Sequence, residues 1–313
     1  MRVCGPHPRA DSEGEGQLLQ WGYHPQRVAS VHIPVKARQF LGRIRLGINH
    51  ALGRQPMTKT FTTYPDDVWL VSYPKSGNTW TRFLIANLVA GGKTVDWTSI
   101  ERIVPDIYIN REEHVKPLPR PRYFKSHEGY RPEYRRVLFI VRDPRDVAVS
   151  YYHFIRKTNT LPIDASMADF MKKFLDGTID PYGNWGENVG SWLGARRDTA
   201  DFLIVRYEDL LENTEVELAR IADMLRIAAD DKLLHHAIEN SRADRMRELE
   251  QAQRGAHKML KTTRADIPFV RAAKSGQWRT ELPAEAVRQI ESAWSPVMRE
   301  LGYSEAAVME AVR

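Results

Sequence analysis

One short segment combines a lysine, small residues and the start of a helix in the order that suits phosphate binding. An apolar run at 68–71 leads into residues 73–80 (YPKSGNTW), where a helical pattern begins. The backbone N–H groups of such a loop and the positive end of the helix dipole face one point, and Lys75 adds a full positive charge. The Walker pattern Gly-x4-Gly-Lys-Ser/Thr is absent, so the nucleotide-triphosphate signature is missing.

A second candidate group consists of Lys125 and His127, at the end of a short predicted strand. Alternation along an extended chain places both side chains on one side, aimed at a common space. Taken alone, the segment also fits a surface lysine beside a strand-end histidine.

A third candidate group follows the apolar run 137–141, which leads directly into Arg142 and then into a predicted helix that carries Ser150 two turns inside. A guanidinium group gives a phosphate two parallel, permanently charged hydrogen bonds. The alternative is that Arg142 pairs with Asp143 or Asp146.

The segment 254–279, called the basic segment below, holds seven basic residues and one acid, Asp266. Such a charge run fits a solvated loop. It also fits a lid that orders on an anionic ligand, and Gly276 and Trp278 favour the lid because they give it specific backbone and packing features.

Taken together, these segments resemble the cytosolic-type sulfotransferases that use 3′-phosphoadenosine 5′-phosphosulfate (PAPS). Residues 73–80 are similar to the family's YPKSGTTW loop, with Asn78 as the one difference. Further similar blocks are 125–127 (KSH), 142–152 (RDPRDVAVSYY), 207–210 (YEDL) and 271–279 (RAAKSGQWR). Five blocks in this order are far more specific than any one of them.

The resemblance implies one set of residues for the donor and another for the transfer. The donor-binding set is Lys75, Ser76, Gly77, Asn78, Thr79, Trp80, Arg142, Ser150, Tyr207, Ser241, Arg271, Ala272 and Ala273. The catalytic set is His127 as general base with Lys75 and Lys125. By the same resemblance, 76–79 hold the 5′-phosphate, Arg142, Ser150 and Arg271 hold the 3′-phosphate, and Trp80 and Tyr207 contact the adenine.

The chemistry of sulfuryl transfer calls for such parts. By analogy with phosphoryl transfer it is a loose in-line displacement in which charge grows on the leaving oxygen. A lysine and aligned N–H groups stabilise that charge, and an imidazole takes the proton of an alcohol or phenol near neutral pH. The sequence has no metal-ligand spacing, so PAPS is expected as co-substrate, with PAP as its product and no metal.

Three positions depart from the family pattern. Ala272 and Ala273 replace the usual Lys-Gly, and Ala243 stands where a Phe often covers the adenine. These changes put the donor affinity and the adenine wall in question. Asn78 is interpreted as a tolerated polar replacement, because such a loop binds mainly through its backbone.

The elements that must position these residues alternate between strands and helices, which predicts an α/β domain with a central, mainly parallel sheet flanked by helices and a P-loop-like phosphosulfate loop. The predicted strands are 67–72, 122–125, 137–141 and 202–206. The predicted helices are 79–90, 144–156, 166–176, 185–197, 214–226, 231–240, 242–253 and 284–301.

Charge divides the chain into two parts. Residues 1–60 carry 9 Lys/Arg against 3 Asp/Glu, whereas residues 61–313 carry 37 of each. We therefore predict a basic arm over 1–60, partly ordered or docked on the core. The resemblance implies that 61–313 form a sulfotransferase domain. A basic amphipathic stretch at 36–54 could instead lie on a membrane. The near-neutral body argues against a nucleic-acid partner.

The single cysteine, Cys4, excludes an internal disulfide and predicts a reducing compartment. No signal peptide or membrane-spanning run is evident, so a cytoplasmic protein without stable membrane insertion is expected.

The expected acceptor is a small molecule with a hydroxyl group, because aromatic residues are frequent where the acceptor should bind. They are Tyr130, Tyr151, Tyr152, Phe154, Phe170, Tyr182 and Trp185, although core packing explains many of them equally well. A carbohydrate or protein acceptor, a non-catalytic nucleotide-binding homologue and a nucleotide kinase with a degenerate loop are the alternatives. The sequence leaves the oligomeric state open.

Overall fold

The computed structural model describes residues 61–270 and 273–303, except for the side chains of Lys258 and Met259. The predicted basic arm over 1–60 lies outside the described residues, as do Arg271, Ala272 and residues 304–313.

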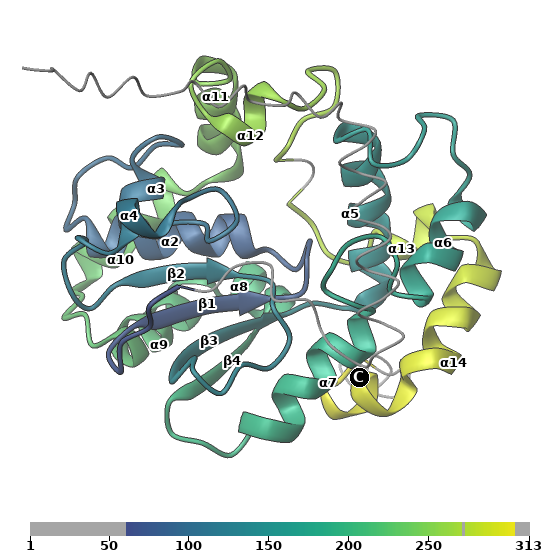
Figure 1. Cartoon of the computed structure of the whole chain (residues 1–313), viewed down its shortest axis with the longest axis horizontal. Helices are drawn as coiled ribbons and strands as arrows, with labels where there is room; N and C mark the ends of the chain where they lie inside the picture. The colour runs from purple at the N-terminus through teal and green to yellow at the C-terminus, as the bar shows by residue number, and fades with distance from the viewer. Residues whose placement is uncertain (1–60, 271–272, 304–313) are drawn as a thin grey trace, which may run out of the picture. The chain divides into compact units, whose positions relative to one another are not determined.

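Four strands form one sheet within this part of the chain (Figure 1). They are β1 (Val68–Ser72), β2 (Tyr123–Ser126), β3 (Arg136–Val141) and β4 (Phe202–Arg206), in the order β2-β1-β3-β4. Each neighbouring pair is parallel, with Val71 opposite Ser126, Ser72 opposite Ile140 and Val141 opposite Arg206. The four carboxyl ends therefore meet at one edge of the sheet.

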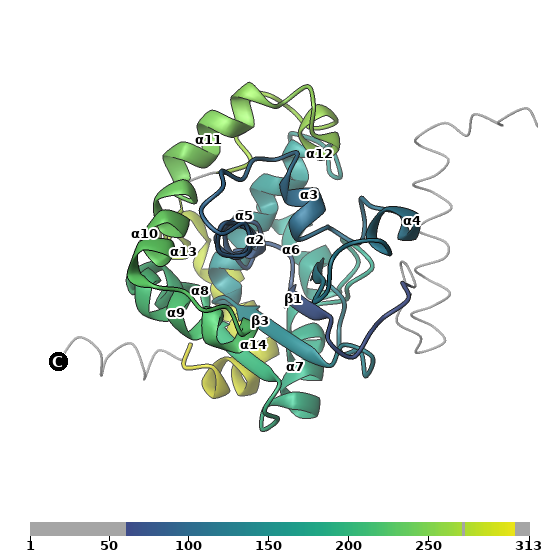
Figure 2. The same cartoon turned by 90° about the vertical axis from the view of Figure 1, so that its left-hand side faces the viewer.

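The side chains of the strands separate the core into two layers, because alternate residues face opposite sides. On one face, Trp69 and Val71 pack with α5 (Pro144–Lys157), α6 (Met167–Leu175), α7 (Trp185–Arg196) and α14 (Ala284–Glu300). On the other face, Val68 and Leu70 pack with α2 (Asn78–Val89), α9 (Thr214–Leu225) and α10 (Asp231–Asn240). Strands buried on both faces read as continuous apolar runs, which is typical of parallel sheets. On the second face, α2 lies beside α10 in both views (Figures 1 and 2).

Thirteen helices occur within the described residues. They are α2 (Asn78–Val89), α3 (Ile100–Ile103), α4 (Glu112–Val115), α5 (Pro144–Lys157), α6 (Met167–Leu175), α7 (Trp185–Arg196), α8 (Tyr207–Glu212), α9 (Thr214–Leu225), α10 (Asp231–Asn240), α11 (Ala243–Ala252), α12 (Lys258–Lys261), α13 (Trp278–Glu281) and α14 (Ala284–Glu300). None of them is long and apolar enough to cross a bilayer.

Local sequence explains where the helix that carries Ser150 begins. Asp143 accepts a hydrogen bond from the Arg145 N–H at 2.9 Å, and Pro144 occupies the first helical position. An aspartate cap followed by proline starts a helix efficiently, because proline lacks the N–H that would have no acceptor there. The chain therefore turns from β3 into α5 within two residues.

The predicted fold class is confirmed: an α/β arrangement with a central parallel sheet and helices on both faces. All four predicted strands and all eight predicted helices are present, with ends displaced by at most two residues. The prediction missed α3, α4, α8, α12 and α13, which have four to six residues and too few turns to show a helical period.

The packing of α7 against α14 gives a test of the fold with a matched control. A Cβ at Gly186 would lie 2.3 Å from Trp294 Cδ1, whereas a Cβ at Gly194 on the same helix would have no atom within 4 Å. Gly186→Ala should lower the free energy of unfolding by about 1–3 kcal/mol through overpacking. Gly194→Ala should leave it unchanged or raise it by up to about 1 kcal/mol. Urea unfolding of both variants measures this, and equal effects would contradict the packing described.

Candidate active site

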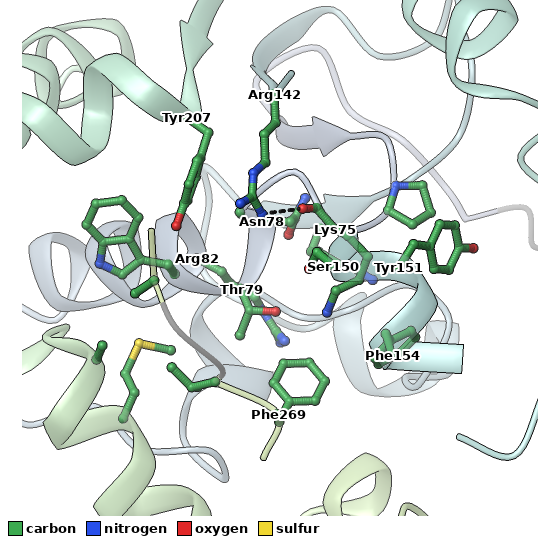
Figure 3. Close-up of a pocket in the computed structure, with 18 of the residues that line it drawn as sticks. Lys75, Asn78, Thr79, Arg82, Arg142, Ser150, Tyr151, Phe154, Tyr207 and Phe269 are labelled. Atoms are coloured by element: carbon green, nitrogen blue, oxygen red, sulfur yellow. Dashed lines mark hydrogen bonds between the residues drawn. The ribbon is translucent and has the colours of Figure 1, made fainter. Parts of the chain in front are cut away.

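A cavity of about 970 Å³ opens at the carboxyl edge of the sheet. It is lined by residues that follow each of the four strands, among them Lys75, His127, Arg142 and Tyr207. Figure 3 shows Lys75, Arg142 and Tyr207 around the cavity. Ligand sites in open parallel sheets lie outside the carboxyl ends of the strands. A cavity of this size holds a nucleotide together with a small second molecule.

The loop between β1 and α2, residues 73–77, has the backbone form of an anion-binding nest. Lys75 has φ 68° and Gly77 has φ 96°, so two nearby residues adopt the left-handed region. Alternation of this kind turns successive N–H groups toward one concavity. Helix α2 begins at Asn78, and its first N–H groups have no acceptor within the helix.

Gly77 is required for a second reason, its contact with Tyr207, the residue that follows β4. A Cβ at this position would lie 2.4 Å from Cδ2 of Tyr207. The glycine lets the tyrosine ring pack directly on the loop. The loop and the Tyr207 ring therefore form one wall of the cavity.

Lys75 points into the cavity between two aromatic rings (Figure 3). Its Nζ lies 4.2 Å from the ring centroid of Phe154 and 5.0 Å from that of Phe269. Aromatic faces attract a cation through the ring quadrupole, so this part of the wall suits an ammonium group.

The side chains of Ser76 and Asn78 are turned away from a direct role as anion ligands. Ser76 is fully buried and does not line the cavity. Asn78 lines it, but its amide nitrogen donates to Ser72 Oγ at 3.0 Å. Asn78 is thus bound to β1, and the buried Oγ of Ser76 has no hydrogen-bond partner among the described residues.

Arg142 is held toward the cavity by backbone acceptors. Its guanidinium donates to the carbonyl oxygens of Lys75 at 3.2 Å and Lys274 at 3.0 Å, and it stacks 4.3 Å from the Tyr207 ring centroid. The alternative pairing with Asp143 does not occur, because Asp143 binds Arg145 at 2.7 Å. The buried Nε of Arg142 has no hydrogen-bond partner among the described residues, and a bound anion would supply one.

Other predicted donor residues are distributed around the same cavity. Thr79, Trp80, Ser150 and Ala273 line it. Ser241 does not, because it is fully buried and its Oγ accepts from Asn87 Nδ2 at 3.2 Å. Its neighbours Arg242 and Ala243 form that part of the wall instead. Arg271 and Ala272 lie outside the described residues.

Buried carboxylates hold the described part of the basic segment against the cavity. Glu250 accepts hydrogen bonds from the N–H groups of Phe269 at 2.7 Å and Val270 at 3.1 Å. Asp146 accepts from Gly276 at 2.6 Å and Trp278 at 3.0 Å. These four residues are therefore anchored to the core, whereas Lys274 and Arg279 of the same segment are exposed to solvent.

Ala273 takes a conformation that suits the glycine it replaces in the family pattern. Its φ is 50°, in the left-handed region that alanine adopts only at a cost of about 1 kcal/mol.

His127 is fixed by two backbone hydrogen bonds. Its Nδ1 lies 2.8 Å from the carbonyl oxygen of Ser72, and its own N–H donates to the Tyr108 hydroxyl at 2.8 Å. A carbonyl oxygen only accepts, so Nδ1 carries the proton and Nε2 is left with a free lone pair. This tautomer is the one that accepts a proton at Nε2.

Lys125 lies next to His127 in the cavity wall and is paired rather than exposed. Its Nζ contacts Asp106 Oδ2 at 2.9 Å. Burial lowers the pKa of Lys125, and the charge of Asp106 opposes that change. For His127, burial first and then the charge of Lys125 lower the pKa well below 6.5. The imidazole is therefore neutral at pH 7, as a general base must be.

Some of the aromatic residues singled out in the sequence belong to this cavity and others do not. Tyr151, Phe154 and Tyr182 line it, whereas Phe170 and Trp185 are buried in the core. Sequence reasoning missed Asp106, Tyr108 and Asp180, which also line it. No motif marks these three, because their place depends on how the loops before β2 and α7 fold.

A phosphate loop, a second cationic group and a neutral histidine around one cavity define a transferase that acts on a phosphorylated donor. Residues 65–302 match the family described as Sulfotransferase domain, and the chain belongs to this family. This confirms the resemblance drawn from the sequence and the enzyme class, a sulfotransferase.

Relatives with assigned names agree with this family. Sulfotransferase 1B1 of Mus musculus is 26% identical over 254 residues, which are 76% of this chain and 84% of the relative. Sulfotransferase 1E1 of Bos taurus is 28% identical over 240 residues, 70% and 79% of the two chains.

Solved structures of related fold agree with the architecture. Mouse sulfotransferase SULT7A1 complexed with PAP has a TM-score of 0.64 and 24% identity, covering 80% of this chain and 90% of its own. Retinol dehydratase in complex with androsterone and inactive cofactor PAP has a TM-score of 0.62 and 20% identity, covering 82% and 85%.

The electrostatic coupling of Lys125 to His127 can be measured by titration. In the wild-type protein the pKa measured from the His127 ring signal should lie below 6.5, because burial and the charge of Lys125 disfavour the imidazolium. Lys125→Gln should raise this pKa, since it removes a cation and leaves Asp106 unpaired. Histidine NMR titration measures both, with His127→Ala to assign the signal. Lys116→Gln, at an exposed lysine, is the control, and an equal pKa in all three proteins would refute the coupling.

Proposed function

We propose that this protein transfers the sulfuryl group of PAPS to a hydroxyl group of a small aromatic or hydrophobic acceptor. The observation that carries the proposal is the convergence of the phosphate loop, Arg142 and a neutral His127 on one cavity in a chain of the sulfotransferase family. The PAP bound in the two related structures supports PAPS as the donor. The names of the relatives support sulfation as the reaction.

The donor is proposed to span two anion sites of the cavity. The N–H groups of residues 76–79 bind the 5′-phosphate end, with Lys75 beside them. Arg142 binds the 3′-phosphate, whose oxygens suit its planar fork and its free Nε. Ser150 and Arg271 assist at the 3′-phosphate, as predicted from the family pattern.

The adenine is proposed to stack on Trp80 and to contact Tyr207. These rings are perpendicular, with centroids 5.9 Å apart, and both line the cavity. The 241–243 segment and residues 272–273 complete this end, with Ser241 acting through its backbone since its side chain is bound to Asn87.

His127 is proposed to act as general base in an in-line displacement. The acceptor oxygen forms a bond to sulfur while the bond from sulfur to the bridging phosphate oxygen breaks, and the electron pair stays on that oxygen as PAP leaves. The acceptor proton passes to His127 Nε2, which its Nδ1 contact with Ser72 leaves free. Lys75 stabilises the charge on the leaving oxygen, and Lys125 supports the negative acceptor oxygen.

An acceptor of the proposed kind meets a largely aromatic wall. The cavity is lined by four aromatic residues, Tyr108, Tyr151, Phe154 and Tyr182. Among them, Phe154 contacts Lys75 and Tyr182 contacts His127. Flat apolar molecules bind such walls well.

The absence of a metal from the reaction and a cytoplasmic location remain predictions from the sequence.

Arg142 gives a test of the two-anion donor site. Arg142→Gln should weaken the binding of PAP by about 10- to 100-fold, because it removes charge-assisted hydrogen bonds to the 3′-phosphate. It should change the binding of adenosine 5′-monophosphate, which has no 3′-phosphate, by less than about threefold. Titration calorimetry measures both nucleotides, and an equal loss for both would show that Arg142 does not bind the 3′-phosphate.

The transfer itself is tested with PAPS and a panel of phenols, aliphatic alcohols and sugars, read by the mass gained by the acceptor. Wild-type protein should sulfate phenols in a donor-dependent reaction. His127→Ala should lower turnover by about 10²- to 10⁴-fold and still bind PAP, because it removes only the base. Near-normal turnover in this variant would remove His127 from the base role. PAP binding with no transfer to any acceptor would favour a non-catalytic homologue.

A further inference from the structure

Asp180 lies in the cavity wall but has no task in the reaction proposed above. It belongs to the loop between α6 and α7 and is half-buried, so part of its carboxyl group stays open to the cavity. Its Oδ1 accepts a hydrogen bond from the Tyr182 N–H at 2.9 Å. Within the described residues, its Oδ2 has no donor.

Tyr182 connects Asp180 to the reacting side of the cavity. Its ring centroid lies 5.5 Å from the imidazole of His127 and 5.3 Å from the ring of Tyr108. The Tyr108 ring is nearly parallel to the imidazole, with centroids 6.0 Å apart and an angle of 9°. A flat acceptor that presents its hydroxyl group to His127 therefore meets two tyrosine rings, with the Asp180 carboxyl group on the same wall.

The basic side chains Lys125 and Arg131 are paired with acids other than Asp180. Asp106 is paired with Lys125 at 2.9 Å, and Glu128 is paired with Arg131 at 3.2 Å. In the part of the chain that the structure describes, Asp180 has no such partner. Burial, and then repulsion from Glu128, raises the pKa of Asp180 to about 7. A carboxyl group in this environment gains strongly from a cation that brings its own charge and hydrogen-bond donors.

We propose that Asp180 makes the cavity selective for phenolic acceptors that also carry a protonated amine on a short alkyl chain. This inference rests on the function proposed above and names its substrate class. The ammonium group supplies the missing partner of Asp180 Oδ2, while the ring of Tyr182 packs against the phenol ring. Tyr108 already has Lys125 Nζ over its ring, 4.8 Å from the centroid, so the amine is expected at Asp180 and not at Tyr108. The hydroxyl group at the other end of the phenol then lies at His127.

The test compares tyramine with 4-ethylphenol, which has the same ring and a chain without the amine. Wild-type protein should have a kcat/KM for tyramine at least about tenfold above that for 4-ethylphenol, since a charged hydrogen bond is gained. Asp180→Asn should reduce this ratio by about 10- to 100-fold, with sulfation of 4-ethylphenol within about threefold of wild type. Retained 4-ethylphenol turnover also shows that the variant is folded.

Asp176→Asn is the matched control, because Asp176 is an exposed acid in the same loop. It should keep the wild-type ratio. The inference is overturned if wild-type protein does not prefer tyramine, or if Asp180→Asn and Asp176→Asn have the same ratio as wild type.

Binding separates this inference from the proposed function. Titration of PAP-saturated protein with tyramine and with 4-ethylphenol requires no turnover. If neither phenol is sulfated, the proposed function fails. The Asp180 inference still stands in that case if tyramine binds more tightly than 4-ethylphenol and loses this advantage in Asp180→Asn, and it falls if the two bind equally.

Discussion

The parallel pairing of four strands is the constraint on which the site depends. Because β2, β1, β3 and β4 run in one direction and in register, their carboxyl ends meet at one edge. The residues that follow these ends are the phosphate loop after Ser72, His127 after Ser126, Arg142 after Val141 and Tyr207 after Arg206. Residues as far apart in the chain as Lys75 and Tyr207 therefore line a single cavity.

Buried carboxylates then turn this edge into an enclosed site. Asp146 and Glu250 hold the backbone of the basic segment on either side of residues 271–272, and Asp143 occupies Arg145 so that Arg142 remains directed at the cavity. Asp106 holds Lys125 in the cavity wall through an ion pair. Acids thus fix the positions of Lys125 and Arg145 beside this edge.

The sequence was sufficient to predict the fold and the residues that follow strands, because both depend on local signals. Strand runs, helix periods and the spacing of Lys125 and His127 are properties of short segments. The orientation of individual side chains could not be predicted, because it depends on tertiary contacts. Ser241 is bound to Asn87, and Asn78 is bound to Ser72. Lys125 is paired with Asp106, which lies 19 residues away in the chain. Asp180 could not be recognised, because its significance lies in a missing cation that only the assembled cavity reveals.

The central claim is that one edge of the sheet holds two anion sites and a base around a single donor and acceptor. A crystal structure of the protein with PAP and 4-ethylphenol measures this most directly. The account predicts the 5′-phosphate against the N–H groups of residues 76–79, the 3′-phosphate on Arg142, and the phenol oxygen within hydrogen-bond distance of His127 Nε2. A nucleotide bound in the reverse direction, or a phenol bound away from His127, would contradict it.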